Sequence, residues 1–326
     1  MTAPTGWDVT GYYAAQLLPE QAPPDSVVRV AELGIITPRP LQLGDFLGGA
    51  FRAVRYSPVT MFGVTLMGML VAQLLAVGVG VVAGREFTSV LDTTELGAVG
   101  SLAGWTTIVS YLTTSVATII LQIGLAFAVH EAVFARRTPP SAALRRIGSG
   151  AGAALGFAGL VLLAYLAVGL IVALLANIST TSQNAIGWVI LVPLILAAAV
   201  LSMFLSIRLL LVPPVIAIEK LGPIAAIRRS WELTTGQFWR FLGIFLLSSI
   251  LISMAANVIS TVFSFVAILV SASNPEFGLM VAVAATTVAT AVFYIPLSTS
   301  VITLLYTDAR IRREGHDLAI AEALYG

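Results

Sequence analysis

The chain has 326 residues, of which 58% are hydrophobic and only 10% are charged. Soluble domains carry about 25% charged residues, so this composition excludes a soluble globular protein, a disordered chain and a nucleic-acid-binding protein. The 17 basic residues nearly balance the 16 acidic ones, and there is no cysteine, which excludes disulfides, thiolate metal sites and a cysteine nucleophile. The class that remains is a multi-pass membrane protein.

Residues 1–38 are rich in proline and polar side chains. Segments with so little apolar surface rarely fold alone, so we expect a mobile cytoplasmic arm. Trp7, Tyr12 and Tyr13 are isolated aromatic residues within it. These three residues are candidates for docking a partner protein.

An amphipathic helix is predicted near residues 43–55. Its apolar residues recur at the spacing of one helix face: Leu43, Phe46, Leu47, Ala50, Phe51 and Val54. The segment is too short and too polar to cross a bilayer. We therefore expect it at the cytoplasmic membrane surface, with its apolar face in the lipid.

Five long stretches without Asp, Glu, Lys or Arg follow, and a polar patch at 177–184 divides the longest of them. Because about 20 apolar residues cross a bilayer, the sequence predicts six transmembrane helices. They lie near residues 60–83, 103–129, 151–176, 187–211, 242–270 and 279–306. The predicted fold is an all-α integral membrane domain over residues 39–318, followed by a short cytoplasmic tail at 319–326.

Basic amphipathic segments precede the first, third and fifth predicted spans, near residues 43–55, 140–146 and 222–231. Similar units at similar spacing indicate an internal repeat. We interpret the chain as three hairpins, each preceded by a short cytoplasmic interfacial helix.

Arg85 is the one basic residue in the segments on the opposite side of these spans. The positive-inside rule therefore predicts a multi-pass protein of the inner (plasma) membrane with both termini cytoplasmic. Basic residues near the span ends are candidates for contact with anionic lipid headgroups of the cytoplasmic leaflet: Arg52, Arg55, Arg145, Arg146, Arg228, Arg229, Arg310, Arg312 and Arg313.

Few ionisable residues lie inside the predicted spans. Arg208 is a candidate intramembrane polar site, although its closeness to Pro213 also lets it extend to the headgroup region. Pro193 and Pro296 interrupt the fourth and sixth spans, as in broken transporter helices or simple kinks. The absence of a carboxylate in the middle of any predicted span counts against an ion-coupled transporter.

Small and hydroxyl-bearing residues suggest how the spans pack. Gly148, Gly152 and Gly156 form overlapping GxxxG steps, where we expect close helix contacts. Serines and threonines are frequent in the second and sixth spans, and we expect most of their hydroxyls to bond to carbonyls of their own helix.

Three segments resemble the membrane domain associated with glycerophosphoryl diester phosphodiesterases, which also occurs as stand-alone actinobacterial proteins. They are RPLQLGDFLGGAF at 39–51, SWELTTGQFWR at 230–240 and LLYTDARIRREGHDL at 304–318. The resemblance implies a six-helix membrane module. The phosphodiesterase chemistry of such proteins belongs to a separate soluble barrel, for which we expect no room after the last span, so only the fold is carried over.

We expect a non-enzymatic scaffold or accessory subunit of the bacterial envelope, without cofactor or metal. It would bind anionic lipids and a membrane-protein partner or a second copy of itself. The alternative is a transporter or lipid-translocating protein. A third interpretation, a membrane enzyme acting on lipid headgroups, would depend on His130, Glu131 and His316.

Overall fold

The computed structural model describes residues 43–90, 102–181, 185–271 and 275–314. Within these ranges every regular element is a helix, and six helices are long and apolar enough to cross a membrane. These observations confirm the predicted all-α fold with six candidate spans. The predicted arm at 1–38 and the tail at 319–326 lie outside the described residues.

The elements in chain order are α3 (Leu43–Tyr56), the π-helical segment η1 (Val59–Gly63), α4 (Val64–Val90), α5 (Leu102–Val133), α6 (Pro140–Thr181), α7 (Ala185–Leu209), α8 (Val212–Glu219), α9 (Pro223–Thr234), α10 (Phe238–Ser271) and α11 (Pro275–Glu314). The candidate spans are Val59–Val82, Ile108–Val133, Pro140–Gly169, Leu191–Glu219, Phe238–Phe265 and Val281–Arg313.

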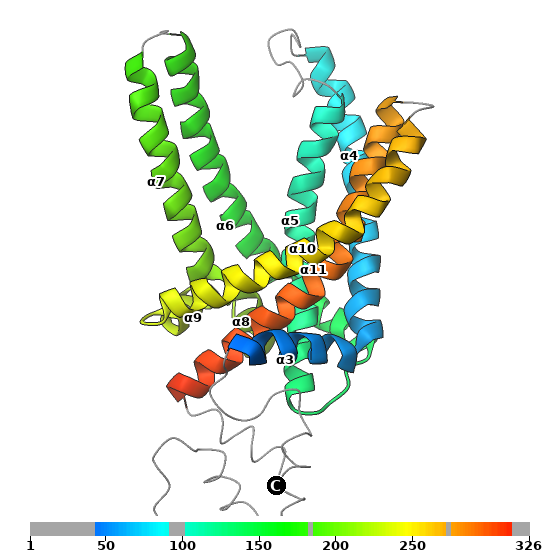
Figure 1. Ribbon diagram of the computed structural model, residues 1–326, viewed down its shortest axis with the longest axis vertical. Coiled ribbons are helices and arrows are strands. Elements are labelled where there is room, and N and C mark those ends of the chain that lie inside the picture. Colours follow the sequence, from blue (N-terminus) through cyan, green and yellow to red (C-terminus); the bar gives the residue numbers. More distant parts are fainter. Residues whose placement is uncertain (1–42, 91–101, 182–184, 272–274, 315–326) are drawn as a thin grey trace, which may run out of the picture.

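Consecutive long helices pack in pairs, α4 with α5, α6 with α7 and α10 with α11 (Figure 1). Helix α11 also packs against α3, α4 and α5, and 67% of its apolar window is buried. The α6–α7 pair diverges from the other long helices (Figure 1), and only 17% of the α6 window is buried. Helix α11 is therefore the centre of the packing, and the α6–α7 pair is its most separate part.

The tightest core lies at the end of the bundle where the short helices gather. Fully buried side chains there come from four helices and from the turn before α8: Phe46, Leu211, Leu233, Phe241 and Tyr306. Helices α3, α8 and α9 and the C-terminal end of α11 share this end of the molecule (Figure 1). We call α3, α8, α9 and residues 306–314 of α11 the basic layer.

The apolar face of α3 is covered by protein, whereas the sequence analysis predicted that it lies in lipid. Phe46 is 0% exposed, and Ala50 and Val54 are also buried, because α3 packs on α11 and α5. Amphipathic spacing identifies a face that must leave water, but a protein surface satisfies that need as well as lipid does.

The predicted second surface helix is also different in the structure. Residues 140–146 form the first turns of α6, which continues to Thr181 without interruption. Nothing between Arg146 and Gly150 stops a helix, since glycine within a helix costs only about 1 kcal/mol. Separate short helices thus precede the first and fifth candidate spans but not the third.

The closest crossing of α5 and α6 is at Gly124 and not at the predicted glycine steps. A Cβ atom on Gly124 would lie 2.7 Å from the Ile147 side chain, whereas one on Gly148 or Gly152 would have no neighbour within 4 Å. Gly156 does meet a neighbour, since its Cβ would lie 3.1 Å from Pro223. The GxxxG expectation is therefore wrong for Gly148 and Gly152.

Candidate functional site

The buried carboxylate of Asp308 connects α11 to α10 and, through Arg240, to α3. Its side chain is 0% exposed and accepts hydrogen bonds from Arg240 Nη1 of α10 at 2.5 Å and from Arg312 Nε at 3.0 Å. The Arg240 guanidinium carbon lies 6.0 Å from the centre of the Phe46 ring on α3. Burying an unpaired carboxylate is very costly, so these two guanidinium groups make the buried position of Asp308 possible.

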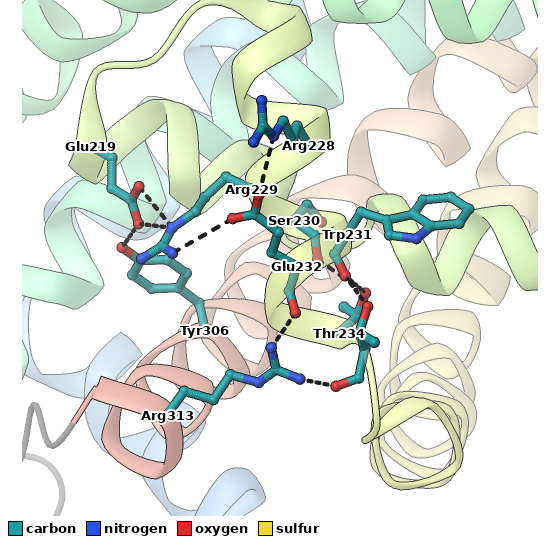
Figure 2. Close-up of polar contacts among 10 residues, drawn as sticks. Glu219, Arg228, Arg229, Ser230, Trp231, Glu232, Thr234, Tyr306 and Arg313 are labelled. Carbon is teal, nitrogen blue, oxygen red and sulfur yellow. Dashed lines mark hydrogen bonds and ion pairs between the residues drawn. The ribbon is translucent and has the colours of Figure 1, made fainter.

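A second network connects α8, α9 and α11 (Figure 2). The Glu219 carboxylate at the end of α8 accepts hydrogen bonds from Arg229 Nε at 3.1 Å and from the Tyr306 hydroxyl at 2.8 Å. Arg310 Nη1 donates to the same hydroxyl at 3.4 Å, and its guanidinium lies 5.7 Å from the Tyr306 ring centre. These contacts hold the short helices on the end of α11.

Arg313 binds the C-terminal end of α9 (Figure 2). Its Nη1 donates to the carbonyl of Glu232 at 2.5 Å, and its Nη2 donates to the carbonyl of Thr235. The last carbonyls of a helix have no partner within the helix and carry partial negative charge. Arg313 therefore acts as a cationic cap that fixes α9 to α11.

Arg208 extends toward α9 and not into the centre of its span. Its Nη1 donates to the Thr235 hydroxyl at 3.0 Å, and the carbonyl of Arg208 accepts from the Ser230 hydroxyl at 2.6 Å. Three aromatic rings lie within 6.0 Å of its guanidinium carbon: Phe204, Trp231 and Phe238. Such contacts satisfy a cation at the edge of an apolar region, and the depth of Arg208 in the membrane stays a prediction.

The nine arginines predicted to contact lipid have different surroundings. Six bind groups within the chain: Arg146, Arg228, Arg229, Arg310, Arg312 and Arg313. Arg52, Arg55 and Arg145 are exposed, and they make no hydrogen bond or ion pair with any of the described residues. Lipid contact stays a prediction, and these three side chains are the ones most available for it.

A pocket of about 550 Å³ lies between the end of α5, the start of α6 and the end of α8. Its polar lining consists of His130, Glu131, Arg145, Arg146, Ser149 and Lys220. His130 and Glu131, the residues of the enzyme interpretation, thus share one pocket with two predicted arginines, whereas His316 lies outside the described residues. No group of three metal-binding side chains occurs in the part of the chain that the structure describes.

Gln73 is a polar contact that the sequence analysis missed. Its Nε2 donates to Thr114 Oγ1 at 2.8 Å, and its Oε1 accepts from Ser110 Oγ at 2.9 Å, which connects α4 to α5. Other hydroxyls bond to their own helix as expected, including Thr118 and Thr287. The sequence did indicate a polar contact at this position, since Gln73 is the one amide side chain in the first uncharged stretch.

Trp7, Tyr12 and Tyr13, the predicted docking residues, lie outside the described residues. Pro193 and Pro296 both lie inside continuous helices, α7 and α11. Pro193 is exposed and Pro296 is buried. Both prolines thus leave their helices unbroken.

The fold and the polar contacts define a multi-pass α-helical membrane protein whose ionic contacts concentrate at one end. Residues 179–319 match the family model described as the membrane domain of glycerophosphoryl diester phosphodiesterase, which confirms the resemblance for this part of the chain. Neither the curated proteins nor the solved structures contain a match to the chain. The segments 230–240 and 304–318, which carried the resemblance, supply Arg240, Asp308 and Arg313 to the contacts above.

Proposed function

We propose that the chain is a non-enzymatic scaffold or accessory subunit of the bacterial inner membrane. In this proposal the basic layer and the start of α6 face the cytoplasm and bind anionic lipid headgroups. The observation that carries it is the exposure of Arg52, Arg55 and Arg145, which have no ion-pair partner among the described residues. Each such arginine near an anionic surface contributes about 1 kcal/mol to binding.

Other arginines near the basic layer hold the helices together and are therefore not available to lipid. Arg240, Arg312 and Arg313 are bound to groups of the chain itself, so they hold α9, α10 and α11 in fixed positions. Helix α3 packs on α11, so Arg52 and Arg55 stand on a rigid support, and this lowers the entropy lost when lipid binds.

The α6–α7 pair supports the partner part of the proposal. Leu163 and Leu166 on α6 and Leu196 and Val200 on α7 are each more than half exposed. In a membrane these side chains meet acyl chains or a helix of another protein, and close packing of helices is favourable there. A membrane-protein partner or a second copy of the chain therefore has a large apolar surface to contact.

The test is the lipid that accompanies the protein through purification in mild detergent. We expect anionic lipid to be enriched over zwitterionic lipid, and the double variant Arg52→Gln/Arg55→Gln to lower the enrichment by up to about 30-fold, since two charges are lost. The matched control Arg52→Lys/Arg55→Lys keeps both charges and the enrichment. Equal enrichment in both variants, or recovery of the chain with neither lipid nor partner, would contradict the proposal.

The alternative, a transporter or lipid-translocating protein, has less support. It rested on the prolines inside the fourth and sixth spans and on the hydroxyl-rich second span, yet both prolines lie inside continuous helices and Thr118 of the second span bonds to its own helix. Arg208 is engaged with Thr235 of the α9 end. Protein-dependent movement of lipid or solute across reconstituted vesicles would nevertheless favour this alternative over the scaffold.

A further inference from the structure

The pocket between α5, α6 and α8 carries a net positive charge. Three cations line it, Arg145, Arg146 and Lys220, together with the single carboxylate of Glu131. Glu131 lies 3.9 Å from Arg136, which is exposed outside the pocket lining. Part of the carboxylate charge is thus offset from outside, and the pocket presents an excess of positive charge to a ligand.

Arg146 is held in place by the chain itself. Its Nε donates to the carbonyl of Ala217 at 2.6 Å, and its Nη2 donates to the carbonyl of Ile216 at 3.4 Å. The guanidinium carbon also lies 6.0 Å from the centre of the Phe127 ring. A cation fixed in this way loses little conformational entropy when an anion binds beside it.

Lys220 reaches the pocket through an unusual backbone conformation. Its φ is +59°, in the left-handed region, where a side chain costs about 1–2 kcal/mol and glycine is favoured. The lysine is exposed and makes no hydrogen bond or ion pair with the described residues. Backbone strain of this kind concentrates at ligand sites, and here it brings the one lysine of the chain to the pocket.

We infer that this pocket binds the phosphate group of a phosphate ester. A guanidinium group binds phosphate oxygens in pairs and an ammonium group adds a point charge, which Arg145 and Lys220 supply. Arg146, whose Nε and Nη2 are bound to backbone carbonyls, adds a fixed positive charge beside them. The volume of about 550 Å³ lies within the range of small-ligand pockets. This inference deepens the proposed function, on which it rests for the location of the pocket at headgroup level.

Because Lys220 is the only lysine, its chemical modification reports directly on the pocket. The full chain is placed in nanodiscs of zwitterionic phosphatidylcholine, treated with an amine-reactive acylating reagent, and the modified peptide is quantified by mass spectrometry. Inorganic phosphate and glycerol phosphate are added in separate arms at constant ionic strength, and a further arm includes phosphatidylglycerol in the nanodisc. We expect at least fivefold slower modification of Lys220 in one or more of these arms.

The arms identify the source of the phosphate group. Slowing by phosphatidylglycerol alone assigns the pocket to a lipid headgroup, and slowing by the soluble compounds assigns it to a free phosphate ester. The variant Arg228→Lys adds a second, exposed lysine on α9, outside the pocket, as a control for general accumulation of anions. Unchanged modification of Lys220 in every arm, or equal slowing of the control lysine, would overturn the inference.

Two substitutions test the cations directly, with affinity for the most protective phosphate compound as the measurement. We expect Arg145→Gln and Lys220→Gly each to weaken binding at least tenfold, while Lys220→Gly keeps the thermal stability of the unmodified chain because glycine suits the left-handed backbone. Unaltered affinity in both pocket variants would refute the assignment.

The two proposals fail in different ways. If the pocket binds phosphate but the basic layer does not collect lipid, Lys220 is protected by soluble phosphate while no anionic lipid copurifies. If the layer collects lipid but the pocket is not a phosphate site, anionic lipid copurifies and Lys220 stays equally reactive in all arms.

Discussion

Asp308 shows how the surroundings of one residue determine its contribution to stability. Its carboxylate is fully buried, and the side chains of Arg240 and Arg312 that bind it are only 31% and 33% exposed. Arg228 and Glu232 form a pair of the same chemistry at 3.2 Å, but Arg228 is 84% exposed. Water and salt screen the second pair far more than the first, so the two pairs are expected to differ strongly in energy.

The substitution Asp308→Asn removes the counter-charge of two partly buried guanidinium groups while it preserves the shape of the side chain. We expect the free energy of unfolding to fall by on the order of 3 kcal/mol, as for other broken buried ion pairs. The measurement is reversible unfolding in mixed detergent micelles. Arg228→Gln is the matched control, with a change below about 0.5 kcal/mol; equal losses in the two variants would contradict this account.

Gln73 gives a second prediction for a single side chain. Gln73→Leu keeps the volume but removes the hydrogen bonds to Ser110 and Thr114 of α5. Both hydroxyls can turn back to carbonyls of their own helix, so we expect a loss of only about 0.5–1 kcal/mol. The same unfolding measurement applies, with Thr118→Val as control because Thr118 bonds within α5. A larger loss in the control would show that the connection between helices is not what stabilises the pair.

At the scale of elements, Gly124 allows the close crossing of α5 and α6. A Cβ on Gly124 would lie 2.7 Å from Ile147 and 3.0 Å from the carbonyl oxygen of Ala143, so Gly124→Ala forces the Ile147 side chain or helix α6 to shift. We expect destabilisation of about 1–3 kcal/mol, measured by thermal unfolding in detergent. Gly152→Ala meets open space and should be neutral or slightly stabilising. The reverse order would favour the GxxxG steps as the crossing.

The helices were predictable because length and continuous apolar character are properties of a segment by itself. What covers each helix depends instead on which other helices pack against it, and a single segment does not contain that information. The apolar face of α3 was identified from spacing, but Phe46 is covered by protein because α11, more than 200 residues later in the chain, packs there. The arginines were likewise visible, whereas the pairing of Arg240 with Asp308, 68 residues away, required the fold.

At the scale of the whole molecule, α11 organises the end where the charges lie. Tyr306 contacts α8, Asp308 contacts α10 and Arg313 contacts α9. The opposite ends of the long helices carry no such network among the described residues. Among the described residues the ion pairs thus gather at one end, and the positive-inside rule predicts that the end rich in arginine is cytoplasmic.

This orientation can be tested because the chain contains no cysteine, so single cysteines report position without background. Arg228→Cys marks the basic layer, where residue 228 is 84% exposed, and Thr94→Cys marks the segment between the first two predicted spans. We expect a membrane-impermeant maleimide to label the Thr94→Cys variant in spheroplasts and the Arg228→Cys variant only in inverted vesicles. The opposite pattern would place the arginines outside, where the anionic cytoplasmic leaflet could not be their ligand.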